Sequence, residues 1–261
     1  MNTVKRVLPA ENDELRACME RVVVRTPASG PNPDATICRA TDAALKAFSN
    51  HHWMAGVCLS EKADRENATI QAYLGHCYFH GKGVARDPVA GALWFRRSAE
   101  KGNVMAMFNL AYCLFNGEGA EKDDVEAVKW YRKAAIRGDV FSQRILAFFY
   151  ENGIGVPQDD AQAARWYWMA AEQGDACSQC GYGICLKEGI GVEPDSEEAV
   201  LWFRKSARQG YARALYNLGV CSIEGAGVPQ DEATALDCWF RAARKGSTEA
   251  QRELALRGLS L

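Results

Sequence analysis

The chain has 261 residues, of which 48% are hydrophobic and 25% are charged, a globular composition that excludes disorder as its main state. Its 31 basic and 33 acidic residues give a formal charge of −2 and are interspersed, which argues against a dominant nucleic-acid or anionic-membrane surface. No window approaches the ~18 uninterrupted apolar residues of a membrane span, and the first apolar stretch ends at Pro9, too early for a secretory signal. We therefore expect a soluble, cytoplasmic protein without membrane insertion.

The first part of the chain, residues 1–66, is expected to form a helical cap that includes a degenerate repeat. Helical patterns cover residues 11–24 and 36–49, and residues 53–65 have the pattern of a worn second helix. The segment TPASGPNPD, 26–34, is typical of a loop or hinge.

Residues 67–246 contain five copies of one 36-residue unit. Each copy has a pair of glycines in a loop and a third glycine after the next helical pattern, and each column repeats at a step of 36 residues. The columns are Gly81/Gly83, Gly117/Gly119, Gly153/Gly155, Gly189/Gly191 and Gly225/Gly227, followed by Gly102, Gly138, Gly174, Gly210 and Gly246. Such regular self-similarity is the signature of a stacked repeat architecture.

Each copy contains two helical patterns and no alternating pattern, which predicts an all-α fold. In the second helix Ala127, Tyr131, Ala134 and Ala135 form one wide apolar stripe, with Trp130 beside it. The first helix has its own stripe and a column of small residues that lets two helices approach closely. This column consists of Gly75, Ala111, Ala147, Gly183 and Gly219.

The loop NGIGVPQDD, residues 152–160, allows two interpretations. Its glycines and aspartates resemble a phosphate-cradling loop, but such a loop follows a strand, carries Lys and Ser/Thr, and occurs once. Alternatively, Gly153 stops the first helix, Gly155 completes a tight reversal and Asp159 caps the second helix. Because the pattern occurs five times, we favour the turn and the cap, and we expect no nucleotide or other cofactor.

The last part, residues 247–261, is expected to form a C-terminal capping helix. Ala250, Leu254 and Ala255 match the first-helix columns, so one lone helix is predicted over residues 248–257.

The repeat carries a family resemblance. The pattern A-x-x-x-L-[GA], then G-x-G-V-x-x-D, then A-x-x-W-[YF]-x-x-[AS]-A-x-x-G resembles the Sel-1-like repeat, a relative of the tetratricopeptide repeat, in five full copies. The resemblance implies a right-handed α-solenoid of antiparallel helix pairs, with helical caps at both ends. It also implies an adaptor in protein complexes, although some similar proteins are secreted and disulfide-bridged.

Ten cysteines raise the question of disulfides. Four of them, Cys77, Cys113, Cys185 and Cys221, share one phase of the repeat and so occupy equivalent positions on parallel helices. Such helices lie ~8–10 Å apart, beyond the usual Cα separation of a disulfide. We therefore expect buried thiols and a reducing compartment.

Two clusters resemble metal or redox sites. His76 and His80 are spaced i, i+4 beside Cys77, but no third ligand is apparent and a helix C-terminus alone favours His80. Cys177 and Cys180 form a C-x-x-C without a second pair, so packing is favoured over a zinc or redox role. We expect no metal.

The outer face of the first helices is the candidate binding surface. Residues at i, i+3, i+7 and i+10 there are largely apolar, with isolated charges, where a solvated face would be polar. In tetratricopeptide-like solenoids, which the chain resembles, this face lines a concave groove that suits a peptide. Alternatively, tight curvature or the N-terminal helices bury it. The candidate groove residues are Met105, Phe108, Tyr112, Phe115, Phe141, Arg144, Phe148, Ile184, Lys187, Arg213, Tyr216 and Val220.

Two functions from different classes follow. The first is a non-enzymatic scaffold or adaptor that binds a protein or peptide partner in the groove. The second is a hydrolase or enzyme subunit acting on a cell-wall or small-molecule substrate, an activity with which some similar proteins have been credited. A convergent nucleophile–base–orienter set is not evident in the sequence, which favours the adaptor. The partner, the pathway and the oligomeric state stay open.

Overall fold

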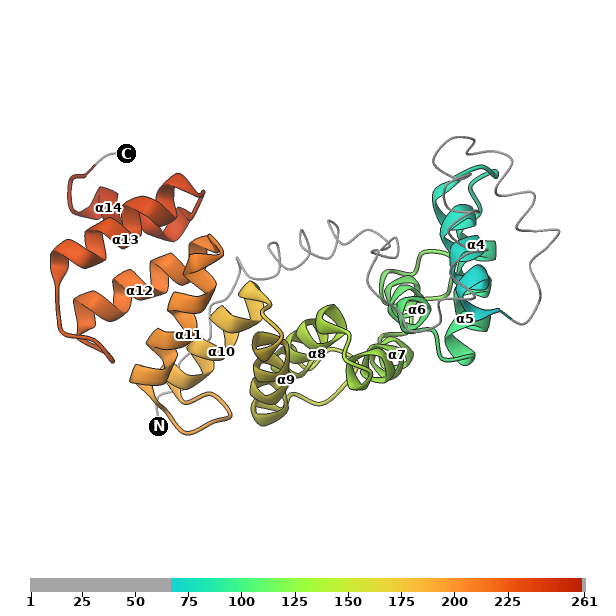
Figure 1. Cartoon of the computed structure of the whole chain (residues 1–261), viewed down its shortest axis with the longest axis horizontal. Coiled ribbons are helices and arrows are strands. Elements are labelled where there is room, and N and C mark those ends of the chain that lie inside the picture. The colour runs from blue at the N-terminus through green and yellow to red at the C-terminus, as the bar shows by residue number, and fades with distance from the viewer. Residues whose placement is uncertain (1–66, 260–261) are drawn as a thin grey trace, which may run out of the picture. The chain divides into compact units, whose positions relative to one another are not determined.

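A computed structural model of the chain describes residues 67–259 (Figure 1). These residues form eleven α-helices and no strand. The chain divides into two compact units, with the boundary between Lys122 and Asp123. The described helices of the first unit are α4 (Ala68–His80), α5 (Pro88–Glu100) and α6 (Val104–Asn116). Those of the second are α7 (Asp124–Ile136), α8 (Val140–Asn152), α9 (Asp160–Glu172), α10 (Ala176–Glu188), α11 (Ser196–Arg208), α12 (Ala212–Glu224), α13 (Glu232–Arg244) and α14 (Thr248–Leu256).

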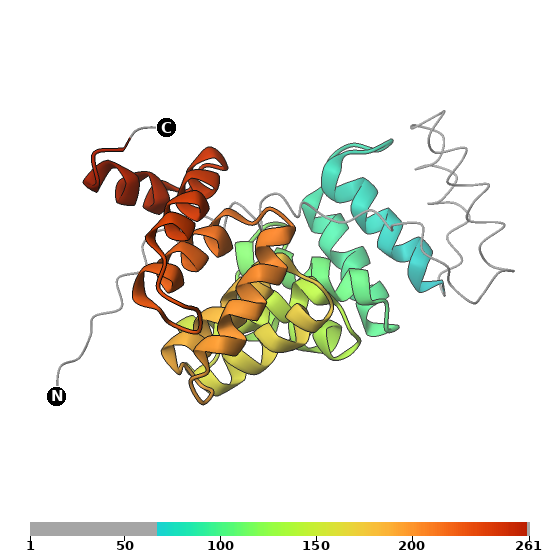
Figure 2. The same ribbon diagram turned by 60° about the vertical axis from the view of Figure 1, so that its left-hand side comes forward.

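Within each unit, every described helix packs against the helix that follows it in sequence. In the second unit, for example, α13 packs against both α12 and α14 (Figures 1 and 2). Consecutive helix pairs of this kind make an α-solenoid, so the predicted fold class is confirmed. The helices predicted at residues 11–24, 36–49 and 53–65 lie outside the described residues.

The loop between the two helices of a repeat is a turn with a cap. The helix α8 ends at Gly153, which has a φ of 67° and donates its backbone N–H to the carbonyl of Phe149. The Asp159 side chain accepts the backbone N–H of Gln162 at the start of α9. Equivalent aspartates cap α5, α7, α11 and α13, so the predicted turn and cap are confirmed.

A second capping column precedes the first helices and was not predicted. Asn103, Asp139 and Asp175 accept backbone N–H groups at the starts of α6, α8 and α10. In the fifth repeat the same position is Tyr211, whose side chain makes no cap hydrogen bond. The helix α12 therefore lacks a stabilisation of about 1 kcal/mol that its counterparts have.

The column of small residues on the first helices packs against aromatic rings of the second helices. An added Cβ at Gly183 would lie 2.7 Å from the Phe203 ring, and one at Gly219 would lie 2.4 Å from the Trp239 indole. The rings of Phe203 and Trp239 are buried because glycine leaves them room. This geometry explains the predicted close approach of the two helices.

Buried glutamines tie successive repeats together. Gln143 Nε2 donates to the carbonyl of Ala135 at 3.0 Å, and Gln143 Oε1 accepts from Gln173 Nε2 at 2.7 Å. Gln179 and Gln209 form the same pair one repeat later, at 2.9 Å. Each bond satisfies a carbonyl or an amide that burial would otherwise leave unpaired.

One buried indole, that of Trp166, has no hydrogen-bond partner among residues 67–259. Trp130 Nε1 donates to Glu126 Oε1 at 3.2 Å, and Trp202 Nε1 donates to Glu198 Oε1 at 3.1 Å. In α9 the corresponding residue is Gln162, and the buried Nε1 of Trp166 finds no acceptor in the described part of the chain.

We therefore expect Gln162→Glu to raise the free energy of unfolding by about 1 kcal/mol. The new carboxylate can accept the indole N–H and also lies in the first turn of α9, where the helix dipole favours negative charge. Chemical denaturation of the variant measures the gain. Repeating the exchange in a Trp166→Phe background should remove most of it, and an undiminished gain would assign the effect to the dipole alone.

Candidate protein-interaction surface

The twelve candidate groove residues fall into two groups. Met105, Phe108, Tyr112 and Phe115 lie on α6 in the first unit, and the other eight lie on α8, α10 and α12 in the second. Each group is therefore a surface of its own unit.

On α6, the candidate residues differ in accessibility. Phe108 is 2% exposed and belongs to the core. Met105, Tyr112 and Phe115 are half-buried. The Tyr112 ring meets Phe79 edge-on, with centroids 6.4 Å apart, and Lys122 Nζ lies 5.6 Å from the Phe115 ring centroid.

On α8, two of the three candidate residues are buried. Phe148 is 7% exposed and Arg144 is 6% exposed, whereas Phe141 is half-buried. Arg144 Nη1 donates to Asp175 Oδ1 at 2.9 Å, and its guanidinium stacks on Phe141 at 4.9 Å. The charge of Arg144 thus meets an acidic group of its own unit, the residue that caps α10.

The exposure expected of the whole face is wrong for Phe108, Arg144 and Phe148. The alternative, in which part of this face lies in the interior, holds at these three positions. Arg144 can be buried because Asp175 supplies the carboxylate that a buried guanidinium needs.

On α10, Lys187 also has partners within its unit. Its Nζ donates to Glu188 at 3.1 Å and to Glu224 on α12 at 2.9 Å. Burial lowers the pKa of Lys187, but the hydrogen bonds and charges of Glu224 and Glu188 outweigh burial, so the pKa lies above its ordinary value. Lys187 therefore joins α10 to α12 and stays charged.

The remaining candidates form a half-buried apolar row. Ile184 packs against the core around Phe203, and Tyr216 and Val220 pack against the core around Trp239. Arg213 lies beside them on α12 and is also half-buried. Burial, together with Glu253 and Glu249, raises the pKa of Tyr216, so its hydroxyl stays protonated and is able to donate a hydrogen bond.

Among the described residues, the histidine pair has Lys82 as its neighbour and no third metal ligand. His76 Nε2 accepts from Lys82 Nζ at 3.0 Å, and the two imidazole centroids lie 4.6 Å apart. Over residues 67–259, no group of three or more His, Cys, Asp or Glu side chains is placed to hold a metal ion.

The cysteines within residues 67–259 carry thiols and not disulfides. Burial raises the pKa of the Cys113 thiol to about 12 and that of the Cys221 thiol to about 11. Thiols of this kind are neutral and poorly nucleophilic at neutral pH. Cys177 and Cys180 lie in the first turns of α10, where Cys180 is buried and Cys177 is half-buried.

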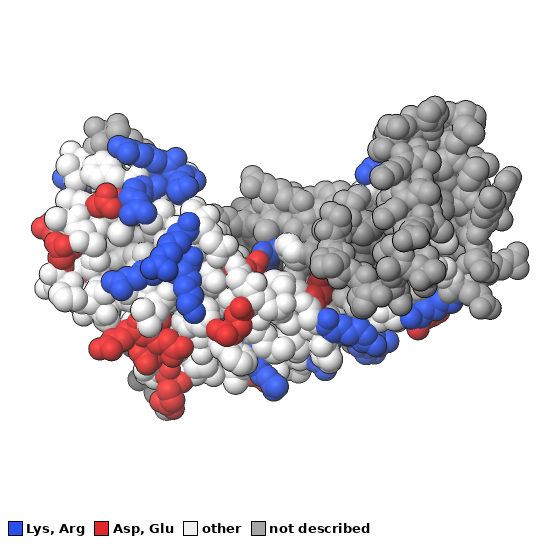
Figure 3. Space-filling model, in the orientation of Figure 1, with Lys and Arg blue, Asp and Glu red and all other residues white. Residues whose placement is uncertain are grey.

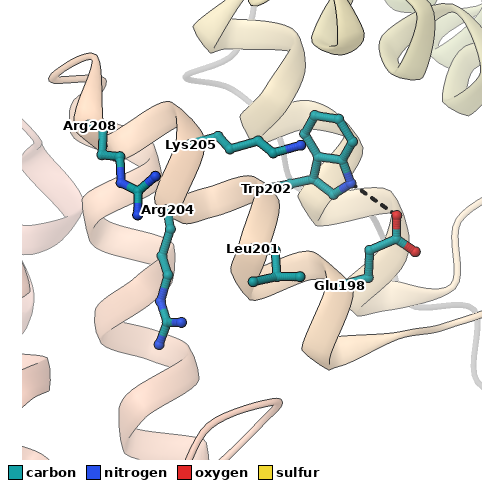
Figure 4. Close-up of a pocket in the computed structure, with 6 residues that line it drawn as sticks. All are labelled: Glu198, Leu201, Trp202, Arg204, Lys205 and Arg208. Carbon is teal, nitrogen blue, oxygen red and sulfur yellow. Dashed lines mark hydrogen bonds between the residues drawn. The ribbon is translucent and has the colours of Figure 1, made fainter.

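The sequence reasoning missed a second feature, on the outer surface of α11. A shallow depression of about 280 Å³ is lined by Leu201, Arg204 and Arg208, together with Glu198, Trp202 and Lys205 (Figure 4). The signal available in the sequence was Leu201, an apolar residue at a position that α7 and α9 fill with Lys129 and Arg165.

The stacked helix pairs, their caps and their glycine-lined contacts define an α-solenoid repeat protein. Comparison with known families then finds Sel1 repeats in five segments, residues 71–103, 104–139, 140–175, 178–211 and 212–247. The chain belongs to the Sel1 repeat family, as the resemblance of its motifs indicated. Sel1 repeat proteins are commonly protein-interaction scaffolds.

Two solved structures support the assignment. One is a protective antigen present in uropathogenic Escherichia coli strains, which displays an SLR fold, with 31% sequence identity and a TM-score of 0.80. The match covers 84% of this chain and 49% of that one, so the chain spans about half the length of the antigen. The other is a Sel1 repeat protein from Oxalobacter formigenes, with 30% identity, a TM-score of 0.75, and coverage of 82% and 87%. No curated protein gives a significant match.

In the described part of the chain, the longest helices have 13 residues, and none is long and apolar enough to cross a membrane.

Proposed function

We propose that the chain is a non-enzymatic scaffold that binds a protein partner on the half-buried face of α8, α10 and α12. The observation that carries this proposal is the row Phe141, Ile184, Tyr216 and Val220, whose side chains are only partly buried and lie on three successive first helices. Partly exposed apolar and aromatic side chains on adjacent repeats are the usual anchors of a protein interface.

The partner that fits this face is an extended or helical peptide segment. The row supplies apolar contacts from three successive first helices, and the Tyr216 hydroxyl and Arg213 add polar groups at one end. Lys187 and Arg144 are held by Glu224 and Asp175, so they shape the surface rather than recruit acidic groups. In the first unit, Met105, Tyr112 and Phe115 form a smaller surface of the same kind, which we propose as a separate contact.

The chemistry of the buried groups supports a non-catalytic role over the hydrolase alternative. Cys77 is fully buried and adjacent to His76, but burial raises the pKa of its thiol, which is the opposite of an activated nucleophile. His76 accepts a hydrogen bond from Lys82, which leaves Nε2 unavailable as a base. We also propose a cytoplasmic location, which the buried thiols support because such thiols persist in reducing compartments.

The experiment is affinity capture from the native cell followed by titration of the captured partner. We expect Tyr216→Ser and Phe141→Ser to weaken binding by roughly tenfold or more each, since buried aromatic anchors contribute at least about 1–2 kcal/mol. Both side chains are half-buried, so circular dichroism should show intact helices.

The matched controls are Val125→Ser and Trp168→Ser, at side chains that are 53% and 45% exposed on second helices of the same unit. These variants should bind as the wild type does. Partners that are lost from the control variants, but retained by Tyr216→Ser and Phe141→Ser, would place the interface on the second helices instead.

A further inference from the structure

The outer surface of α11 has a charge arrangement that the other second helices of its unit do not share. Leu201, Arg204 and Arg208 follow one stripe of the helix, and Glu198, Trp202 and Lys205 follow the neighbouring one (Figure 4). Leu201 is 55% exposed, and both arginines are exposed.

The Glu198, Trp202 and Lys205 stripe is structural, because α7 repeats it. Trp202 donates its indole N–H to Glu198, and Lys205 Nζ lies 3.5 Å from the Trp202 ring centroid. In α7, Trp130 donates in the same way to Glu126, and Lys133 Nζ lies 3.7 Å from the Trp130 ring centroid. This stack holds the ammonium group of Lys205 at the edge of the depression. Because α7 has the same stack, the stack alone does not indicate a binding site.

The other stripe is where α11 differs. In α7 the outward arginine, Arg132, donates to the Tyr150 hydroxyl and stacks on its ring. The residue on α12 that corresponds to Tyr150 two repeats later is Ser222, which has no ring and donates its hydroxyl to the carbonyl of Leu218 at 3.0 Å. The residue that corresponds to Arg208 is Ile136 in α7 and Glu172 in α9. Within residues 67–259, no carboxylate lies within 4 Å of the guanidinium of Arg204 or Arg208.

A further cation lies close to this stripe. The Lys245 ammonium comes within 3.0 Å of the position that a Cβ on Gly210 would take, two residues after Arg208. The positive side chains thus extend from α11 across to the end of α13, and Figure 3 shows basic side chains gathered over this part of the second unit. Exposed arginines that find no carboxylate within the described part of the chain are prepared for bidentate contact with a carboxylate of another molecule.

The acidic residues at the start of α11 limit what this surface accepts. Glu197 and Glu198 lie in its first turn, and Glu193 and Asp195 precede it. A long uniform polyanion such as a nucleic acid would cross these carboxylates and be repelled. A short segment with a few carboxylates and one aliphatic side chain would match the guanidinium groups and Leu201 without reaching the acidic residues at the start of α11.

We propose that the α11 depression, lined by Leu201, Arg204, Lys205 and Arg208, docks a short acidic segment of a partner protein that also carries an aliphatic side chain. Two carboxylates pair with Arg204 and Arg208, and the aliphatic group covers Leu201. This surface is on a second helix and is separate from the row on α8, α10 and α12, so it goes beyond the scaffold function proposed above.

The test is fluorescence anisotropy of the full chain with a labelled short peptide of glutamate and leucine. We expect Arg204→Gln/Arg208→Gln to weaken binding about tenfold or more, because two charge-assisted contacts are lost. Lys129→Gln/Arg165→Gln removes the same charge from exposed positions of α7 and α9 and should change binding less than about twofold, by the loss of long-range attraction alone. Circular dichroism should show intact helices in both.

Two further measurements separate docking from general charge attraction. Leu201→Gln should weaken binding of the glutamate–leucine peptide but leave binding of a glutamate–serine peptide unchanged. Equal losses from the two charge-removing pairs would overturn the proposal. So would tighter binding of a single-stranded oligonucleotide, or self-association in light scattering that Arg204→Gln/Arg208→Gln abolishes, which would assign the surface to nucleic acid or to a second copy.

Discussion

Gly191→Ala should lower the free energy of unfolding by about 2–6 kcal/mol, more than a typical surface substitution. Gly191 has a φ of 69°, which an L side chain adopts at a cost of about 1–3 kcal/mol. An added Cβ would also lie 2.1 Å from the backbone carbonyl oxygen of Asp160, in the first turn of α9. Because that oxygen belongs to the helix backbone, no side-chain rotation relieves the contact, and α9 must separate from the loop after α10.

Gly174→Ala is the matched control for this prediction. Gly174 has a φ of 92°, but an added Cβ there would meet no atom within 4 Å, so only the backbone cost of about 1–3 kcal/mol applies. Chemical denaturation of both variants, with hydrogen exchange of the amides in α9 and α10, measures the difference. Equal losses in the two variants would show that the close contact between repeats contributes nothing beyond the conformation of the glycine.

The contrast between these glycines shows how much of the repeat could be predicted from the sequence. The step of 36 residues, the αL glycine that ends each first helix and the aspartate that caps each second helix are local features, so periodicity and cap chemistry suffice to find them. The second loop glycine was expected only to complete a reversal. Its contact with the preceding repeat depends on how repeats stack, and a local pattern does not contain that information.

The candidate surface was harder to predict for the same reason. The 36-residue repeat places Phe148, Ile184 and Val220 at one position of successive first helices, but it does not say which of these side chains a neighbouring helix covers. Arg144 looked available because its partner, Asp175, is 31 residues away and was not recognised as a cap. Conversely, the difference between Arg204 and Arg132 follows from the exchange of Tyr150 for Ser222, which becomes visible only when repeats are compared position by position.

Acid should destabilise the first unit through His76, by up to about 3 kcal/mol between pH 6.5 and pH 4. His76 is 4% exposed, and burial, then Lys82 and then His80 lower its pKa from 6.5 to about 4. In the native state His76 Nε2 accepts a hydrogen bond from the Lys82 ammonium, which can donate but cannot accept. Protonation of His76 therefore breaks this bond and places two cations 3.0 Å apart. The unfolded chain binds the proton near pH 6.5, whereas the native state does so only near pH 4. The free energy of unfolding therefore falls as the pH falls from 6.5 to about 4. Below about pH 4, His76 causes no further change.

The measurement is an NMR titration of the imidazole protons together with denaturation at several pH values. His76→Phe is the informative variant, because the corresponding position two repeats later is Phe148, where an aromatic ring is buried. It should lose stability less steeply than the wild type as the pH falls from 6.5 to 4, after the common effect of carboxylate protonation is subtracted. His80→Asn, which copies Asn116 and Asn152, should retain most of the wild-type slope, since His80 is only half-buried whereas His76 is buried. A His76 signal that titrates near pH 6.5, or identical slopes in His76→Phe and the wild type, would mean that the imidazole reaches solvent and that its hydrogen bond to Lys82 does not hold it neutral.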